Sequence, residues 1–216
     1  MSGNLKEIKL LDVIKAKNDK QKEFIRMVNE KDFVLVSSIF GTGNTYLTVG
    51  TACQLLAEGK IERVIFTRAS LHLVQEYGYS TGSYDEKSRE YFKQAIRYFH
   101  SFLGRPVFEQ LWRAGIISLT ASEIITGDDY KSSLIVMDEC QEADKEDLRD
   151  VLTRMSKGSK IIMIGDHGQN KLKDRCFWKR FVDNVHHDNL GKIEFTRLEG
   201  CRHSDVYDIV EQLDAL

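Results

Sequence analysis

The feature that most constrains this chain is an alternation of short, apolar, β-branched runs with longer charged segments of helical periodicity. The strand candidates are residues 32–37, 63–67, 116–120, 133–137, 160–164 and 192–196. The helix candidates are residues 19–29, 45–58, 84–103, 142–155, 174–186 and 204–213. Continuous apolar runs such as VIFT, LIVM and IIMI suit strands that are covered on both faces. The pattern therefore predicts an α/β fold, with a parallel sheet flanked by helices.

The length and composition favour one ordinary globular domain spanning residues 1–216, without internal repeats or a dividing linker. The net charge of −2 neither indicates nor excludes a nucleic-acid partner. The four cysteines are far apart and form no CxxC pair, which argues against zinc and favours free thiols in a reducing cytoplasm. We find neither a signal-peptide pattern nor an apolar run of about 18 residues, so we expect a cytoplasmic protein without a membrane span.

A glycine-containing loop follows the first strand candidate and precedes a helix candidate. The segment SIFGTGNT begins at Ser38, and the phosphate-loop pattern at such a place is GxxxxGK[ST]. Gly43 and Thr45 match, whereas Ser38 and Asn44 replace the first glycine and the lysine. Gly41 and Gly43 allow backbone N–H groups to point at a phosphate, and the Thr45 hydroxyl is placed to bind Mg²⁺. Taken alone, the loop is explained somewhat better by an ordinary glycine turn before a helix.

Carboxylates follow the apolar run at 133–137. Asp138 and Glu139 would lie at the carboxyl edge of a parallel sheet, where ligands bind in such folds. Asp138 would hold Mg²⁺, and Glu139 would polarise an attacking water. The next strand candidate is followed by GDHGQ, which places Gln169 opposite a terminal phosphate. The alternatives are an acidic start of a helix and a solvent-exposed glutamine.

The ordered motifs together resemble one family. They are Gln21, GTGNT, Thr67-Arg68, DECQ, LTR, GSK, GDHGQ and CRH. From about Gln21 to the last residue, the chain resembles the PhoH-like family, the phosphate-starvation-inducible ATPases of bacteria and their phages. The resemblance implies a RecA-like P-loop NTPase core, similar to one motor domain of the helicases. It also implies ATP and Mg²⁺ as cofactors and a link to RNA metabolism.

The resemblance assigns roles to residues. The nucleotide-binding set that it implies, with Gln21 at the adenine, is Gln21, Gly41, Thr42, Gly43, Asn44 and Thr45. Thr45 and Asp138 would bind the metal, Glu139 would act on water, and Gln169 would sense the γ-phosphate. Arg202 would stabilise transition-state charge as an arginine finger does. Because one motor domain has no second half to supply that arginine, Arg202 reaching a neighbouring subunit of a ring-like homo-oligomer is a reasonable hypothesis.

The chain departs from the family pattern around the expected ligand. The family has lysine where this chain has Asn44, proline at Ala69, a Leu-Pro-Gly turn at 80–82 and an arginine near Thr126. An asparagine brings no charge, and charge-assisted hydrogen bonds are roughly twice as strong as neutral ones. Losing one preorganised donor costs on the order of 10²–10³ in rate. We therefore expect weakened ATP binding and slow or absent hydrolysis.

A basic run supports a single-stranded RNA or DNA partner. Residues 154–180 hold eight basic and two acidic side chains, with Phe177 and Trp178 interleaved. A solvated face with core aromatics is the alternative. Three functions stay open: an RNA-associated ATPase, a non-hydrolysing nucleic-acid-binding protein, and a small-molecule phosphotransferase. GDHGQ and CRH fit a motor core better than the last of these.

Overall fold

The sheet predicted from the sequence is present. The computed structural model describes residues 8–68, 89–121, 125, 129–166 and 177–214. One six-stranded sheet has the order β3-β2-β4-β5-β1-β6, and every pair is parallel. Its strands are β1 Phe33–Ser38, β2 Arg63–Arg68, β3 Ile117–Ala121, β4 Ser133–Asp138, β5 Lys160–Gly165 and β6 Leu190–Phe195. Each overlaps a predicted strand, which confirms the α/β fold.

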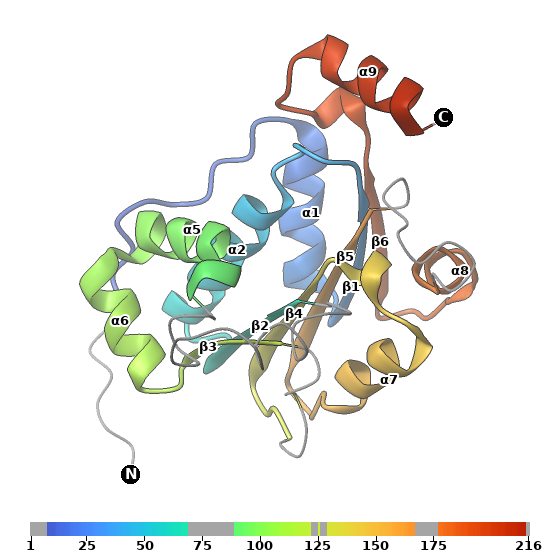
Figure 1. The fold of residues 1–216 in the computed structure, drawn as a ribbon. Helices are drawn as coiled ribbons and strands as arrows, with labels where there is room; N and C mark the ends of the chain where they lie inside the picture. Colours follow the sequence, from blue (N-terminus) through green and yellow to red (C-terminus); the bar gives the residue numbers. More distant parts are fainter. Residues whose placement is uncertain (1–7, 69–88, 122–124, 126–128, 167–176, 215–216) are drawn as a thin grey trace, which may run out of the picture.

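Helices cover both faces of the sheet. They are α1 Asp19–Glu30, α2 Asn44–Ala57, α5 Lys93–Leu103, α6 Arg105–Arg113, α7 Lys145–Thr153, α8 Trp178–Asn184 and α9 Ser204–Asp214. Figure 1 shows α1, α2, α5 and α6 on one side of the sheet, and α7 and α8 on the other. The last helix, α9, lies beyond one end of the strands.

Alternate side chains of the central strands enter two separate cores. In β4, Leu134 and Val136 join the core under α1, α2, α5 and α6, whereas Ile135 and Met137 join the core under α7 and α8. Because both faces of these strands are buried, their sequences are continuously apolar rather than alternating. At the sheet edge, β6 alternates between buried and more exposed positions, which explains why its limits were harder to predict.

The helix predicted at 142–155 begins later, at Lys145. Asp144 is the N-terminal cap of this helix. Its Oδ1 accepts hydrogen bonds from the backbone N–H groups of Glu146 (2.8 Å) and Asp147 (3.0 Å), which fixes the start of the helix at Lys145. Residues 140–142 form a 3₁₀ turn instead. The capping aspartate therefore overrides the helical periodicity of the residues before it.

Two helical boundaries on the α2 side also differ from expectation. The predicted helix at 84–103 starts in residues outside the described part, and α5 itself begins at Lys93. Gly104, with φ of 76°, separates α5 from α6. The helix α6 was not predicted from the sequence. Although α6 is short, it buries Phe108 and Leu111. Its proline lies in the first turn, where the missing N–H costs nothing.

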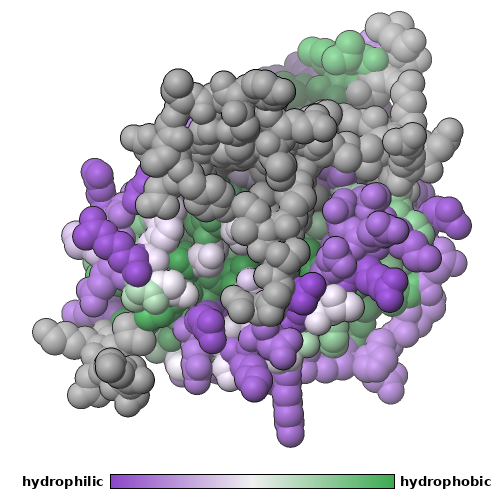
Figure 2. Space-filling model, turned by 60° about the horizontal axis from the view of Figure 1, so that its bottom comes forward, coloured by the Kyte–Doolittle hydropathy of each residue, from purple (hydrophilic) through white to green (hydrophobic). Residues whose placement is uncertain are grey.

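The surface agrees with the balanced composition. On the face that Figure 2 shows, hydrophilic side chains predominate among the described residues, with apolar residues visible between them. No helix within the described residues is long and apolar enough to cross a membrane. Trp178 is 0% exposed and belongs to the core. This confirms that its ring is a core side chain and does not form a surface on which a base could stack.

Candidate functional site

A pocket of about 590 Å³ opens where β1, β4 and β5 end. Because β5 lies between β1 and β4, three strand ends contribute to it. Nine of the ten predicted site residues line this pocket: Gln21, Gly41, Thr42, Gly43, Asn44, Thr45, Asp138, Glu139 and Arg202. The tenth, Gln169, lies outside the described residues. The topology thus brings together residues more than 180 positions apart in the sequence.

The phosphate-loop side of the pocket comprises residues 38–45, between β1 and α2. Gly41 and Gly43 have φ of 78° and 85°, left-handed values that glycine adopts without strain. The Thr42 hydroxyl donates to the carbonyl of Ile39 (3.1 Å), which holds the loop in a tight turn. Gly43 is the N-terminal cap of α2, so the loop leads into a helix N-terminus that favours anions.

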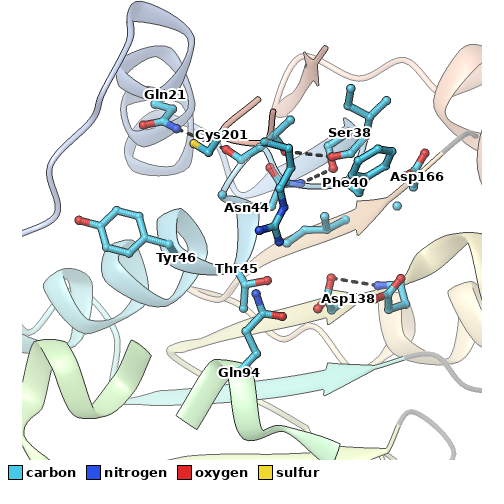
Figure 3. Close-up of a pocket in the computed structure, with 18 of the residues that line it drawn as sticks. Gln21, Ser38, Phe40, Asn44, Thr45, Tyr46, Gln94, Asp138, Asp166 and Cys201 are labelled. Atoms are coloured by element: carbon cyan, nitrogen blue, oxygen red, sulfur yellow. Dashed lines mark hydrogen bonds between the residues drawn. The ribbon is translucent and has the colours of Figure 1, made fainter. Parts of the chain in front are cut away.

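Asn44 stands where the phosphate-loop lysine was expected. Its Nδ2 donates to the hydroxyl of Ser38 at the end of β1. Its Oδ1 is buried and has no hydrogen-bond partner among the described residues. Figure 3 shows the side chain turned toward Ser38, above Thr45. The lysine position therefore contributes a neutral amide that is already engaged within the chain.

Gln21 connects α1 to the phosphate loop. It is 2% exposed, and its Oε1 accepts from the backbone N–H of Lys17 (2.8 Å). Its Nε2 donates to the carbonyl of Thr42 (3.4 Å). Asn18 fixes the start of α1 by accepting from the Gln21 backbone N–H (2.8 Å). In this structure the Gln21 amide serves the loop, and its expected contact with adenine stays a prediction.

The acidic side of the pocket comprises residues 138–141 together with 164–166. Arg68 lies opposite Asp138 in the β2–β4 register and forms an ion pair with Glu139. The Nε2 of Gln141 donates to the other Glu139 oxygen (2.6 Å), and its Oε1 accepts from the Asp166 backbone N–H (3.0 Å). Glu139 is therefore held from two directions, by a cation and by an amide.

The carboxyl group of Asp138 has a raised pKa. Burial raises the pKa of its carboxyl to about 6, repulsion from Glu139 adds to the rise, and Arg68 opposes it. The backbone N–H of Glu139 donates to its Oδ1 (3.1 Å). Such a carboxylate is ionised near neutral pH but lacks full compensation for its charge, so a cation beside it would be favoured.

The donors present fit Mg²⁺ held jointly with phosphates. Asp138 and Thr45 both line the pocket and offer oxygen ligands. Among the described residues, no group of three or more His, Cys, Asp or Glu side chains could hold a metal ion. Mg²⁺ commonly takes one or two protein ligands and completes its shell with phosphate oxygens and water. The site therefore matches a nucleotide-bound metal rather than a dedicated metal cage.

Several lining residues escaped the sequence reading. Lys17, Tyr46, Gln94 and Tyr98 line the pocket from the N-terminal segment, α2 and α5. The rings of Tyr46 and Tyr98 meet edge to face, with centroids 5.6 Å apart. Figure 3 shows Gln94 reaching toward Thr45. No motif marks these positions. Gln141, in contrast, was part of the DECQ motif, although no role was assigned to it.

A family comparison agrees with the motifs. A family model described as "PhoH-like protein" matches residues 13–214, nearly the whole chain. The chain belongs to the PhoH-like family. A PhoH-like protein of Bacillus subtilis is 28% identical over 206 residues, which cover 93% of this chain and 64% of that protein. Protein PhoH of Escherichia coli K12 is 23% identical, over 71% of this chain and 44% of its own length. This PhoH-like chain thus spans between 44% and 64% of the length of these relatives.

Solved structures show the same fold at low sequence identity. The large terminase of a thermophilic bacteriophage aligns with a TM-score of 0.59 and 11% identity, over 92% of this chain and 50% of the terminase. The same terminase in complex with ATP-γ-S aligns with a TM-score of 0.55 and 13% identity, over 90% and 48%. These likenesses establish a P-loop NTPase fold for this PhoH-like chain.

Proposed function

We propose that the pocket binds ATP together with Mg²⁺, and that hydrolysis is slow or absent. The observation that carries this proposal is the convergence of the phosphate loop, Thr45, Asp138 and Glu139 on one pocket at the carboxyl ends of the strands. The terminase neighbour that has this fold was solved with ATP-γ-S, which supports a nucleotide as the ligand. Bound Mg²⁺ would neutralise phosphate charge, with Asp138 and Thr45 as its protein ligands.

The chain's own residues would divide the work. Backbone N–H groups of the loop around Gly43 would bind phosphate oxygens, aided by the N-terminus of α2. Glu139 would orient or deprotonate an attacking water, but in this structure Arg68 and Gln141 hold both of its oxygens. Asn44 adds no charge to stabilise the transition state. The loss of the lysine and the restraint on Glu139 both favour binding over turnover.

Equilibrium binding and phosphate release test this proposal. A fluorescent ATP analogue should bind in the presence of Mg²⁺ and weaken in EDTA. Phosphate release should stay below about 1 s⁻¹, the low end of typical enzymes. Asn44→Lys should raise the rate by orders of magnitude if the rest of the site is intact. Failure of the parent to bind the analogue would sink the proposal, and rapid turnover by the parent would refute its second half.

A link to single-stranded RNA or DNA is a further part of the proposal. Lys145 and Arg180 both lie over the ring of Phe177, at 5.9 and 5.7 Å from its centroid, which gathers cations around a partly exposed aromatic. Part of the basic run, residues 167–176, lies outside the described part of the chain. Salt-dependent binding of single-stranded RNA would support this partner, and no binding at low salt would exclude it.

A homo-oligomer is also proposed. Leu198 is 88% exposed, and Ile209 and Leu213 on α9 are exposed as well. Ile209 and Leu213 are four residues apart and therefore lie on one face of α9, and an exposed apolar helix face is common where a second protein binds. Light scattering with and without nucleotide tests the idea, because a strictly monomeric mass under both conditions would contradict it.

A further inference from the structure

The segment Gly200–Tyr207 docks on the phosphate loop of its own chain. The backbone N–H of Cys201 donates to the carbonyl of Gly41 (2.9 Å). The ring of Tyr207 stacks on Phe40, with centroids 5.0 Å apart and planes at 22°, and its hydroxyl donates to the Phe40 carbonyl (3.4 Å). A Cβ at Gly200 would overlap the Tyr207 hydroxyl, so a glycine is needed for this close approach. Figure 3 shows Cys201 and Phe40 on the same pocket as Asn44.

This docking brings the Arg202 side chain onto the loop. A Cβ at Gly41 would lie 2.6 Å from Arg202 Cγ and 3.2 Å from its Nε, so the arginine stem covers that glycine. Arg202 also lines the pocket. Within the described part of the chain, its guanidinium forms no hydrogen bond or ion pair. The Arg202 guanidinium, with its several N–H donors, is therefore available to a ligand at the phosphate loop, where Asn44 occupies the lysine position.

The pocket is lined by more carboxylates than cations, so the Arg202 guanidinium, which is unpaired within the described residues, matters for binding an anion. Its described lining contains three carboxylates, Asp138, Glu139 and Asp166, against two cations, Lys17 and Arg202. Arg202 packs directly on the phosphate loop at Gly41, whereas Lys17 lies in the segment before α1, where its backbone N–H donates to Gln21 Oε1. A polyphosphate approaching Gly41 would thus meet the Arg202 guanidinium, which comes from the same chain.

We infer that Arg202 takes over, in cis, the phosphate-binding charge that Asn44 cannot supply. The inference rests on the proposed function. A guanidinium can bind two phosphate oxygens at once, and its charge-assisted bonds are about twice as strong as neutral ones. The site is then complete within one chain, and Arg202 holds phosphate in the ground state. An arginine finger reaching a neighbour, the hypothesis drawn from the family resemblance, would instead act mainly on the transition state.

A double-mutant cycle tests the substitution of one cation for the other. The fluorescent ATP analogue with Mg²⁺ is titrated into the parent, Arg202→Gln, Asn44→Lys and the double variant. Arg202→Gln should weaken binding at least about 10-fold. In the Asn44→Lys background the same change should cost less than about 3-fold, because the lysine replaces the lost charge. The matched control is Arg197→Gln, whose side chain pairs with Asp208 outside the pocket.

The outcomes separate the inference from the function on which it rests. Parent binding with no effect of Arg202→Gln would overturn the inference and leave the proposed function standing. Equal losses in both backgrounds would also overturn it, because the two cations would then act independently. Absence of binding by the parent would remove both. A loss for Arg197→Gln as large as that for Arg202→Gln would show a general effect of surface charge and would likewise overturn it.

A mixing experiment distinguishes action in cis from action between subunits. Arg202→Gln keeps Asp138, and Asp138→Asn keeps Arg202, so a shared site between chains would be restored in mixtures. Action in cis predicts that mixtures bind the analogue no better than the sum of the separate variants. Recovery above that sum would overturn the assignment in cis. Circular dichroism of each variant verifies that the comparison is made on folded protein.

Discussion

The two sides of the pocket are built differently. On the phosphate-loop side, neutral hydrogen bonds fix the local geometry: Asn44 to Ser38, Thr42 to Ile39, and Gln21 to Thr42. On the acidic side, the bonds involve charge, with Glu139 held by Arg68 and by Gln141. The loop side is thus rigid but carries no cation in residues 38–45, whereas the acidic side has more carboxylates than cations to balance them.

This difference shows which ligand would relieve both sides. A magnesium–polyphosphate complex would bring a cation to Asp138 and anions to the loop N–H groups. Neither half of such a ligand suits the pocket alone, because free polyphosphate would face Asp138 and Glu139, and free Mg²⁺ finds few protein ligands among the described residues. The arrangement therefore favours joint binding, with Arg202 correcting the charge of the loop side.

The largest effect should come from removing one carboxylate. Asp138→Asn should weaken Mg²⁺-dependent binding of the ATP analogue by on the order of 10²-fold, because even residues behind a metal ligand often contribute 10- to 100-fold. The equivalent change on the loop side, Asn44→Ala, should cost less than about 3-fold, since it removes one neutral bond to Ser38. Titration with and without Mg²⁺ measures both.

Equal losses of affinity for Asp138→Asn and Asn44→Ala would contradict the contrast between the two sides of the pocket. Asn44 would then contribute as much to binding of the ATP analogue as Asp138 does. Asp150→Asn serves as the control. Asp150 is exposed on α7, and its replacement makes the same change of charge away from the pocket. A loss of binding in that control would point to a general effect of charge instead.

The sequence indicated the loop and the carboxylates because each follows a strand in a spaced motif. It also predicted six strands, since buried parallel strands are continuously apolar. It did not show which groups satisfy Glu139, because Arg68 and Gln141 reach it only through strand register and a 3₁₀ turn. The docking of Arg202 on Gly41 was equally inaccessible, since it depends on how residues 200–207 pack after β6.

A matched pair of substitutions compares how firmly each side is held. Gln21 and Gln141 are both 2% exposed, and each joins two segments. Gln141→Leu should lower the free energy of unfolding by about 2–3 kcal/mol, because it removes a bond to a carboxylate and leaves polar groups without their partner. Gln21→Leu should cost about 1 kcal/mol, since its bonds are neutral and one is long.

Urea unfolding of both variants measures this difference. An equal m-value in the two variants ensures that the midpoints report stability alone. If Gln21→Leu proved the more destabilising, the phosphate loop would depend on its tie to α1 more than the acidic side depends on Gln141. The assignment of charged and neutral support to the two sides would then be reversed.

The last effect concerns the pH dependence of stability. The folded-state pKa of Asp138 is raised to about 6, above its usual value, mainly by burial. A raised carboxyl pKa means that the folded state binds the proton more tightly, so the parent loses stability as pH rises from about 4 through about 6. Asp138→Asn lacks this loss. Its stability relative to the parent should therefore grow over that window, by at most about 3 kcal/mol, since each pKa unit is worth about 1.4 kcal/mol.

Urea midpoints at about pH 4.5 and about pH 7.5 check the sign. The advantage of Asp138→Asn should be larger at the higher pH and should shrink when Mg²⁺ and the nucleotide stabilise the parent. An advantage independent of pH would show that Asp138 causes no titration strain, and that the acidic side needs no cation to balance it. An advantage that narrows as pH rises would reverse the sign and remove the electrostatic contrast between the two sides of the pocket.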